Sequence, residues 1–154
     1  MDNYIYILNV RFAGDIHFSK KVECDVENVR VPSMILQPVV ENAVNHGIRN
    51  IDWEGHIDLS VEKWNDHIEI SVRDNGLGMN RRTDTKSTVK KVHSSSGEGD
   101  STGIGMNNVI SRLELYYERD GLMEIYSEGE GMGTEVVINI PLERSEKNVQ
   151  NPDC

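Results

Sequence analysis

Residues 36–47, LQPVVENAVNHG, place polar side chains on a helix that is otherwise apolar. At 3.6 residues per turn, the apolar face of this helix comprises Leu36, Val39, Val40, Ala43 and Val44. The opposite arc is polar and comprises Glu41, Asn42, Asn45 and His46. Taken alone, such an arc is more often a solvated surface than a site, so its meaning depends on motifs elsewhere. We expect Ser33 to cap this helix, Pro38 to remove a hydrogen bond or bend it slightly, and Gly47 to end it.

Length and composition limit the class of protein. The 154 residues suffice for one domain with its own core, and a formal net charge of -10 with a pI near 4.9 disfavours a nucleic-acid or anionic-membrane surface. Cys24 and Cys154 form no metal-binding or redox spacing, which favours a reducing, cytoplasmic setting. No apolar run is long enough to span a bilayer, and the first residues lack a signal-peptide pattern. We therefore expect a soluble piece without membrane or nucleic-acid contact.

The rest of the chain divides into strand-like segments, helices and one long polar stretch. The strand-like segments are 16–26, 56–62, 67–73, 122–127 and 134–140. Residues 4–12 fit a buried strand or an amphipathic helix, and we favour the helix. Another helix follows Gly105 and ends at Asp120-Gly121. Residues 80–102 are almost devoid of apolar side chains and too long for a simple connector, so they predict a mobile loop.

These elements predict a two-layer α/β (α+β) sandwich. About five strands form a mixed, largely antiparallel sheet, in which 56–62 and 67–73 read as a hairpin. About three helices cover one face of this sheet. We expect one domain over residues 1–142 with a lid at 79–102, followed by a polar, disordered tail at 143–154.

Two glycine-containing motifs lie at the ends of predicted elements. DNGLGM, residues 74–79, puts a carboxylate at a strand end before glycines that let the backbone approach a planar ligand, although a plain turn is the simpler interpretation. STGIGMNN, residues 101–108, puts Gly103 and Gly105 just before a helix, where free N–H groups can hold phosphate oxygens. Neither motif matches the Walker or Rossmann pattern, because no lysine follows the glycines and no strand leads into a GxGxxG.

The order of the motifs is more specific than any one of them. LQPVVENAVNHG, DNGLGM, STGIGMNNVISRL and GMGTEV resemble the motifs of the ATP-binding catalytic domain of sensor histidine kinases. That domain has the Bergerat-type nucleotide-binding fold, also found in gyrase, the Hsp90 chaperones and MutL. More narrowly, the motifs resemble the LytS/YesM-like group, and the similarity covers roughly Tyr4 to Leu142. The resemblance implies ATP and Mg²⁺ as cofactors.

The resemblance also implies roles for individual residues. It implies that Asn42 ligates the Mg²⁺ that bridges the ATP phosphates, for which an amide oxygen is a suitable ligand. It implies that Asp74 accepts a hydrogen bond from the adenine 6-amino group, with Thr134 at the base of the adenine pocket. Glu41 and Asn42 are the expected catalytic residues, with Glu41 either a base or a supporting partner. The other residues expected to bind nucleotide are Asn45, His46, Gly76, Gly78, Met79, Gly103, Ile104, Gly105 and Met106.

The expected lid is cationic within an acidic domain. Between residues 81 and 91 the only acid is Asp84, whereas the cations are Arg81, Arg82, Lys86, Lys90 and Lys91. A solvated charge run is the simpler interpretation, and a flap that neutralises triphosphate is the functional one. The sequence supports no catalytic or metal role for His17, His56, His67 and His93.

Three departures from the family pattern limit the prediction. The family's phosphoacceptor histidine lies on a separate helical hairpin, so we expect autophosphorylation to need chain outside this sequence. Many histidine kinases have a lid phenylalanine, but the phenylalanines here are Phe12 and Phe18. Pro38 stands where ATP-hydrolysing relatives have a water-activating glutamate, which disfavours a water-directed ATPase.

The expected function is therefore phosphoryl transfer in two-component signalling. The domain donates the γ-phosphoryl group of ATP to a histidine on a separate dimerisation and phosphoacceptor domain, and a response regulator is the indirect partner. Two alternatives are a Bergerat-type ATPase or nucleotide switch and a serine kinase of an anti-sigma antagonist. The full-length protein is expected to be anchored in the cell membrane.

Overall fold

One mixed sheet organises the molecule. The computed structural model describes residues 16–23, 26, 29, 31–79, 87–88 and 101–142. Within these ranges six strands pair in the order β1-β2-β3-β6-β5-β4. Their bounds are Ile16–Val22 (β1), Gly55–Lys63 (β2), His67–Asp74 (β3), Ser87–Thr88 (β4), Met123–Tyr126 (β5) and Thr134–Pro141 (β6). The expected helix at 4–12, the lid cations between Arg81 and Lys91, and the tail at 143–154 lie outside the described residues.

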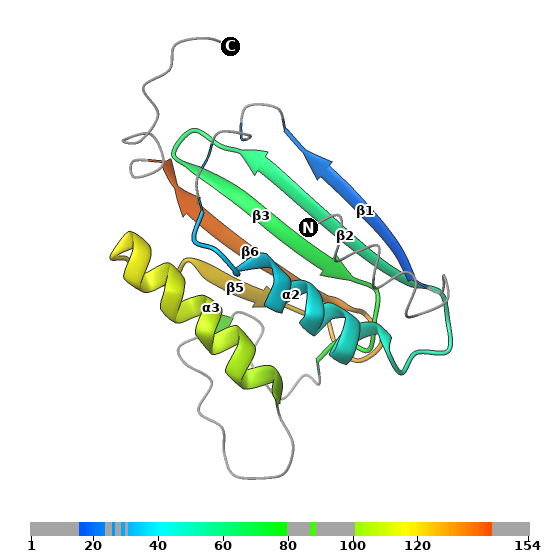
Figure 1. Ribbon diagram of the computed structural model, residues 1–154. Coiled ribbons are helices and arrows are strands. Elements are labelled where there is room, and N and C mark those ends of the chain that lie inside the picture. Colours follow the sequence, from blue (N-terminus) through cyan, green and yellow to red (C-terminus); the bar gives the residue numbers. More distant parts are fainter. Residues whose placement is uncertain are drawn as a thin grey trace.

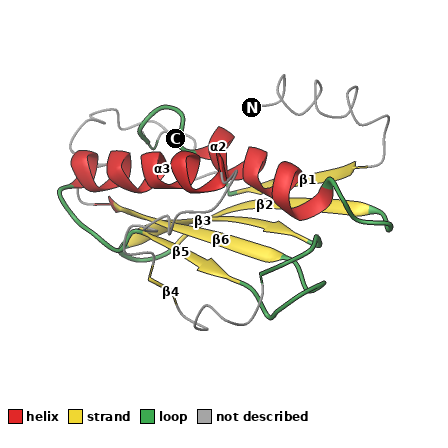
Figure 2. Ribbon diagram, turned by 90° about the horizontal axis from the view of Figure 1, so that it is seen from below, coloured by secondary structure: helices red, strands yellow, loops and turns green. Residues whose placement is uncertain are grey.

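The helices of the described ranges lie on one face of this sheet (Figures 1 and 2). Helix α2, Leu36–Asn42, continues directly into the π-helical segment η2, Ala43–Ile48. Helix α3, Ser101–Tyr117, packs beside α2. Seen along the sheet, α2 and α3 form one layer and the strands form the other (Figure 2). The predicted two-layer sandwich is thus confirmed.

The sheet is mixed because of its first strand. β1 pairs with β2 in parallel, from Ile16 with Gly55 to Val22 with Val61, whereas the other four neighbouring pairs are antiparallel. Parallel strands need a crossover connection. The chain between β1 and β2 supplies it and carries α2 and η2 across the sheet (Figure 1). The predicted hairpin is β2–β3, and the two-residue β4 adds an edge strand to the five predicted ones.

The core lies between the two layers. From α2 and η2 it takes Val39, Val40, Ala43 and Val44, which confirms the apolar face predicted for residues 36–47. The α3 residues in it are Met106, Val109, Ile110, Leu113 and Tyr117. Burying one Val, Leu or Ile side chain contributes about 1.5–3 kcal/mol, so this apolar face fixes how α2 and α3 sit on the sheet.

The start of α2 differs from the prediction. Ser33 does not cap the helix: the N-cap position belongs to Ile35, which makes no side-chain capping bond, and Met34 before it has a left-handed backbone with φ 64°. Pro38 is the third helical residue. Its missing N–H is one of the first four in a helix, which have no partner within the helix, so Pro38 removes no helical hydrogen bond.

The end of the helix also differs. Gly47 lies inside η2, which runs to Ile48 and is closed by a bond from the Arg49 N–H to the Val44 carbonyl at 2.9 Å. This spacing of five residues defines a π turn, a feature often found at functional sites.

No helix in the ranges described here is long and apolar enough to cross a membrane.

Candidate functional site

The centre of the site is a buried carboxylate at the end of the central hairpin. Asp74 is the last residue of β3 and pairs in register with Thr134, the first residue of β6. Both are buried, with 5% and 9% of their surface exposed. Among the residues that the structure describes, Asp74 is the only charged one that is buried. Burying a carboxylate is unfavourable unless it is hydrogen-bonded, so its position calls for a physical explanation.

Backbone groups hold this carboxylate. The Gly76 N–H donates to Asp74 Oδ1 at 2.9 Å, which fixes one oxygen immediately beyond the strand. Burial raises the pKa of Asp74 above its ordinary 3.8, and backbone hydrogen bonds from Gly76 and Thr134 oppose this rise. Among the residues that the structure describes, no lysine or arginine contributes to this pKa shift. The carboxylate can therefore accept a hydrogen bond from a neutral donor without competition from a cation.

Three glycines, Gly47, Gly76 and Gly133, enclose Asp74, and we refer to them as the glycine cradle. A Cβ at Gly47 would lie 2.6 Å from Asp74 Oδ1, and one at Gly133 would lie 2.0 Å from the Asp74 carbonyl oxygen. A Cβ at Gly76 would lie 2.1 Å from the carbonyl carbon of Gly47. No side chain fits at these distances, so only glycine allows η2 and the two loops to close around the carboxylate.

Hydrogen bonds join the parts of the cradle. The Leu77 N–H donates to the Gly47 carbonyl at 2.9 Å, and the Gly133 N–H donates to the Gly76 carbonyl at 3.1 Å. The loop after β3 is therefore fixed to η2 on one side and to the start of β6 on the other. The π turn matters here, because it places Gly47 against Asp74 while Asn45 and His46 remain exposed.

The second half of DNGLGM rests on the β5–β6 loop. Gly78 has φ +68°, and a Cβ there would lie 2.2 Å from the Gly129 carbonyl oxygen. The Met79 N–H donates to Ser127 Oγ at 2.9 Å, and this hydroxyl donates in turn to the Gly133 carbonyl at 2.8 Å. Around these backbone contacts the rim is apolar and exposed, comprising Leu77, Met79 and Met132.

The polar residues of the helix differ in burial: Glu41 and Asn42 are half-buried, whereas Asn45 and His46 are exposed. Asn42 Oδ1 is buried and has no hydrogen-bond partner among the residues that the structure describes. Glu41 is half-buried and accepts a bond from Gln37 Nε2 at 3.1 Å. A buried acceptor without a partner is unfavourable by about 1–3 kcal/mol, and a metal ion or its bound water would satisfy it. Asn42 therefore fits the predicted ligand role, although the described ranges contain no cluster of three or more His, Cys, Asp or Glu side chains that could bind a metal by itself.

The STGIGM motif takes a different form from the prediction. Gly103 and Gly105 do not precede the helix, because α3 already begins at Ser101. At Gly105 a Cβ would lie 3.9 Å from Pro38 Cβ, so the start of α3 faces α2 at the proline. Met106 is buried in the core with 4% exposure.

Several residues of this site were not predicted as site residues. Gly47 was expected only to end a helix, and the glycines of the β5–β6 loop were given no individual role. Ser127, Gly129 and Gly133 nevertheless support the DNGLGM backbone. The sequence signal for them is the density of glycines in SEGEGMG directly before Thr134. Chemically, the assembled site is a buried hydrogen-bond acceptor in a narrow, glycine-lined setting, which suits a planar ligand with an amino group.

Solved structures of similar shape define the class of fold. The chain superposes on the nucleotide-free catalytic domain of histidine kinase ThkA with a TM-score of 0.61 at 17% identity, covering 90% of this chain and 88% of that chain. The histidine kinase domain of a blue-light activated kinase from Erythrobacter litoralis gives a TM-score of 0.58 at 19% identity, with coverage of 94% and 65%. The fold is thus that of histidine kinase catalytic domains, which confirms the predicted fold class.

Sequence comparison then identifies the family. The model of the histidine kinase-, DNA gyrase B-, and HSP90-like ATPase family matches residues 31–144, and the chain belongs to this family. It is 30% identical over 150 residues to the sensor histidine kinase YpdA of Escherichia coli K12, and 30% identical over 139 residues to the sensor histidine kinase YesM of Bacillus subtilis 168. These matches cover 93% and 90% of this chain but 23% and 22% of the relatives, so the chain spans about a quarter of their length.

A third relative supports the narrower resemblance. The chain is 30% identical over 145 residues to the sensor histidine kinase/phosphatase LytS of Staphylococcus aureus MRSA252, which covers 94% of this chain and 24% of that protein. The resemblance to sensor histidine kinases of the LytS/YesM-like group, predicted from the ordered motifs, is thereby confirmed.

Proposed function

We propose that this domain binds ATP with Mg²⁺ and donates the γ-phosphoryl group to a histidine on a dimerisation and phosphoacceptor domain. Family membership and the sensor histidine kinase relatives support the proposal. The observation that carries it is the Asp74 carboxylate, which is buried, has no cation beside it within the described ranges, and is enclosed by the glycine cradle.

The carboxylate explains a preference for adenine. Asp74 offers an acceptor at the end of β3, and the 6-amino group of adenine offers a donor that can meet it. A hydrogen bond to a charged group contributes about 1.5–3 kcal/mol. Guanine and hypoxanthine carry an oxygen at the same ring position, so two acceptors would meet in a buried place. Thr134 lies beside Asp74 in the sheet and forms the base of this pocket in our proposal.

We assign the phosphate groups of the nucleotide to residues of α2, η2 and α3. Asn42 is the protein ligand for Mg²⁺, since its buried amide oxygen has no partner within the described structure and amide oxygens suit this ion. When bound, Mg²⁺ would supply positive charge that neutralises the phosphate oxygens. Asn45 and His46 extend the polar wall, and Glu41 lies next to the metal ligand, as a base or a supporting partner. The remaining residues assigned to the nucleotide are Gly76, Gly78, Met79, Gly103, Ile104 and Gly105, whereas Met106 packs in the core.

The protein contributes positioning and charge neutralisation to this reaction. In phosphoryl transfer there is little covalent chemistry for the protein to perform, so orientation of the nucleotide dominates catalysis. The attacking nucleophile is the imidazole nitrogen of the partner histidine, which we assign to chain outside this sequence. A response regulator is the indirect partner.

Two alternative functions are less well supported. A Bergerat-type ATPase needs a base for water, whereas Pro38 stands at the expected position and faces Gly105 of α3. A serine kinase of an anti-sigma antagonist would use the same nucleotide site, but the relatives named above are sensor histidine kinases.

Titration calorimetry of ATP tests the adenine assignment. Asp74→Ala is expected to weaken ATP binding by about ten- to a hundredfold, because a charge-assisted hydrogen bond is lost. Asp120→Ala is the matched control, since Asp120 is exposed beyond α3. Equal ATP affinity in the wild type and in Asp74→Ala would overturn the assignment of this carboxylate to adenine.

A further inference from the structure

We propose that Asn75 is the positioning residue for the Asp74 carboxylate and thereby sets how strongly the site selects adenine over a 6-oxo purine. This inference rests on the proposed function, because it presumes that Asp74 meets the purine ring. It adds a residue to which the sequence motifs gave no role.

The hydrogen bonds of Asn75 show where the chain leaves the sheet. The last pair of the β2–β3 ladder is Ile57 with Asp74. One residue further, the Asn75 N–H still donates to the His56 carbonyl at 3.2 Å, as a continued ladder would require. The reverse bond is different: the His56 N–H donates to the side-chain Oδ1 of Asn75 at 2.7 Å. The side chain thus takes the place that the Asn75 carbonyl would occupy in the ladder.

Because the side-chain oxygen of Asn75 accepts this ladder bond, the main chain is free to turn away from the sheet. The freed Asn75 carbonyl accepts a bond from Trp53 Nε1 at 2.9 Å, and the side-chain Nδ2 donates to the Glu54 carbonyl at 2.9 Å. All four polar groups of Asn75 are therefore bonded to residues 53–56. The turn that follows brings the Gly76 N–H onto Asp74 Oδ1. Asn75 lies between Asp74 and Gly76, so its hydrogen bonds fix the main chain that carries the carboxylate and the main chain that carries the N–H bonded to it.

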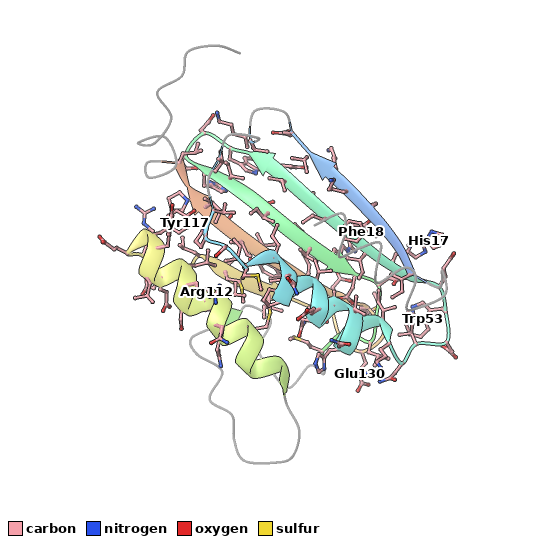
Figure 3. All side chains as sticks on the ribbon, in the orientation of Figure 1. His17, Phe18, Trp53, Arg112, Tyr117 and Glu130 are labelled. Carbon is pink, nitrogen blue, oxygen red and sulfur yellow. The ribbon has the colours of Figure 1, made fainter. Side chains whose placement is uncertain are left out.

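The segment 53–56, to which Asn75 is bonded, is itself held to the edge strand β1. Glu54 Oε1 lies 2.5 Å from His17 Nε2, and Glu54 Oε2 lies 3.5 Å from His56 Nε2. The His17 and His56 rings stack with centroids 5.2 Å apart. Figure 3 shows Trp53 and His17 at the same end of the sheet. Asn75 therefore binds to a segment fixed by β1 and β2, which suits a residue that must hold a carboxylate in place.

Only asparagine meets both side-chain requirements. Its Oδ1 accepts from the His56 N–H and its Nδ2 donates to the Glu54 carbonyl. Aspartate would keep the acceptor but turn an oxygen toward the Glu54 carbonyl, and alanine would remove both groups. The order of function expected from this chemistry is Asn, then Asp, then Ala.

The test compares ATP with inosine triphosphate, which carries an oxygen in place of the adenine amino group. Binding constants for both nucleotides are measured by calorimetry, and thermal unfolding is followed by circular dichroism. Asn75→Ala is expected to lower the ratio of the two affinities by roughly five- to tenfold, as for loss of one hydrogen bond that orients the carboxylate. Asn75→Asp should recover part of the ratio. Asn65→Ala, in the exposed β2–β3 turn, is the matched control.

The outcomes separate this inference from the proposed function. A wild-type domain that selects ATP, with an Asn75→Ala variant that selects it equally well, would overturn the role of Asn75 alone. Equal weakening of both nucleotides would do the same, since it would indicate a merely structural residue. A wild-type domain that binds both nucleotides equally would overturn the adenine site and this inference with it. If Asn75→Ala does not fold, Trp53→Phe removes only the indole donor, and an unchanged ratio in it overturns the inference.

Discussion

At the level of single residues, the site keeps unfavourable groups in place. Asp74 is a carboxylate buried without a cation, and Asn42 holds a buried oxygen without a hydrogen-bond partner in the described ranges. Each arrangement destabilises the free domain, since buried polar atoms lose their hydration. Binding sites commonly carry such groups because a ligand supplies the missing partner.

The raised pKa of Asp74 predicts a stability that depends on pH. The folded state binds this proton more tightly than the unfolded chain, whose carboxyl has the ordinary pKa of 3.8. The contribution of Asp74 to the free energy of unfolding is therefore fully present below pH 3.8. It is lost as pH rises through the raised pKa of the folded state. Asp74→Asn cannot ionise and still accepts the Gly76 N–H, so it should unfold at a higher temperature than wild type at pH 7. This advantage should vanish below pH 3.8.

Thermal unfolding at both pH values measures this difference. Asp120→Asn is the control, because Asp120 is exposed. An Asp74→Asn variant less stable than wild type at pH 7 would contradict the unfavourable burial of this carboxylate.

Asn42 leads to a separate prediction about metal. Asn42→Ala should bind ATP with the same affinity in the presence and absence of Mg²⁺, because the proposed protein ligand is gone. The fold should persist, since the substitution removes a buried acceptor that has no partner in the described structure. Calorimetry with and without Mg²⁺ tests this, with Asn65→Ala as control. If Mg²⁺ still strengthens ATP binding in Asn42→Ala, another residue holds the ion.

At the level of elements, the turns that shape the site depend on contacts distant in sequence. Gly47 resembles a helix terminator because glycine commonly follows a last helical turn. Its actual constraint is the Asp74 carboxylate, which approaches it through the tertiary fold. Apolar spacing also cannot distinguish a single π turn from an α turn, since buried residues on both sides of it still fit a helix. Local rules therefore predicted the helix but misplaced its end.

The same limit explains the start of α3. The glycines of STGIGM favour a loop by local propensity, since each interior helical glycine is unfavourable by about 1 kcal/mol relative to alanine. The structure nevertheless begins α3 at Ser101, and Gly105 faces Pro38 of α2. By contrast, the hairpin of β2 and β3 was predictable, because its alternation and its short polar turn are local features.

The β5–β6 loop offers a matched pair of glycines for a test of the cradle. Gly131 and Gly133 both have φ +74°, but a Cβ at Gly131 meets nothing within 4 Å, whereas one at Gly133 would lie 2.0 Å from the Asp74 carbonyl oxygen. Gly131→Ala should lose about 1–2 kcal/mol of stability from backbone strain alone. Gly133→Ala should lose clearly more, together with ATP binding, as measured by urea unfolding and calorimetry. Equal losses in both variants would show that the close approach is unimportant.

At the level of the whole molecule, topology brings the site together from separate segments. Residues 42–47, 74–79 and 127–134 meet because β3 and β6 are neighbours and η2 packs above their ends. The ordered motifs predicted the first two segments and Thr134, but not the support from Ser127, Gly133 and Asn75. Alternation shows which face of a strand is buried and not which strand is its neighbour, so the parallel pairing of β1 with β2 was not predictable.

The most direct test of the central claim is a transfer assay with γ-labelled ATP. The domain is incubated with Mg²⁺ and a separately produced histidine hairpin from a sensor kinase of the same group, and protein-bound label and released phosphate are measured together. Phosphoryl transfer predicts acid-labile label on the hairpin, its absence when the hairpin histidine is replaced, and strong reduction with Asp74→Ala. Rapid phosphate release with no labelled protein would contradict the kinase account and favour a water-directed ATPase.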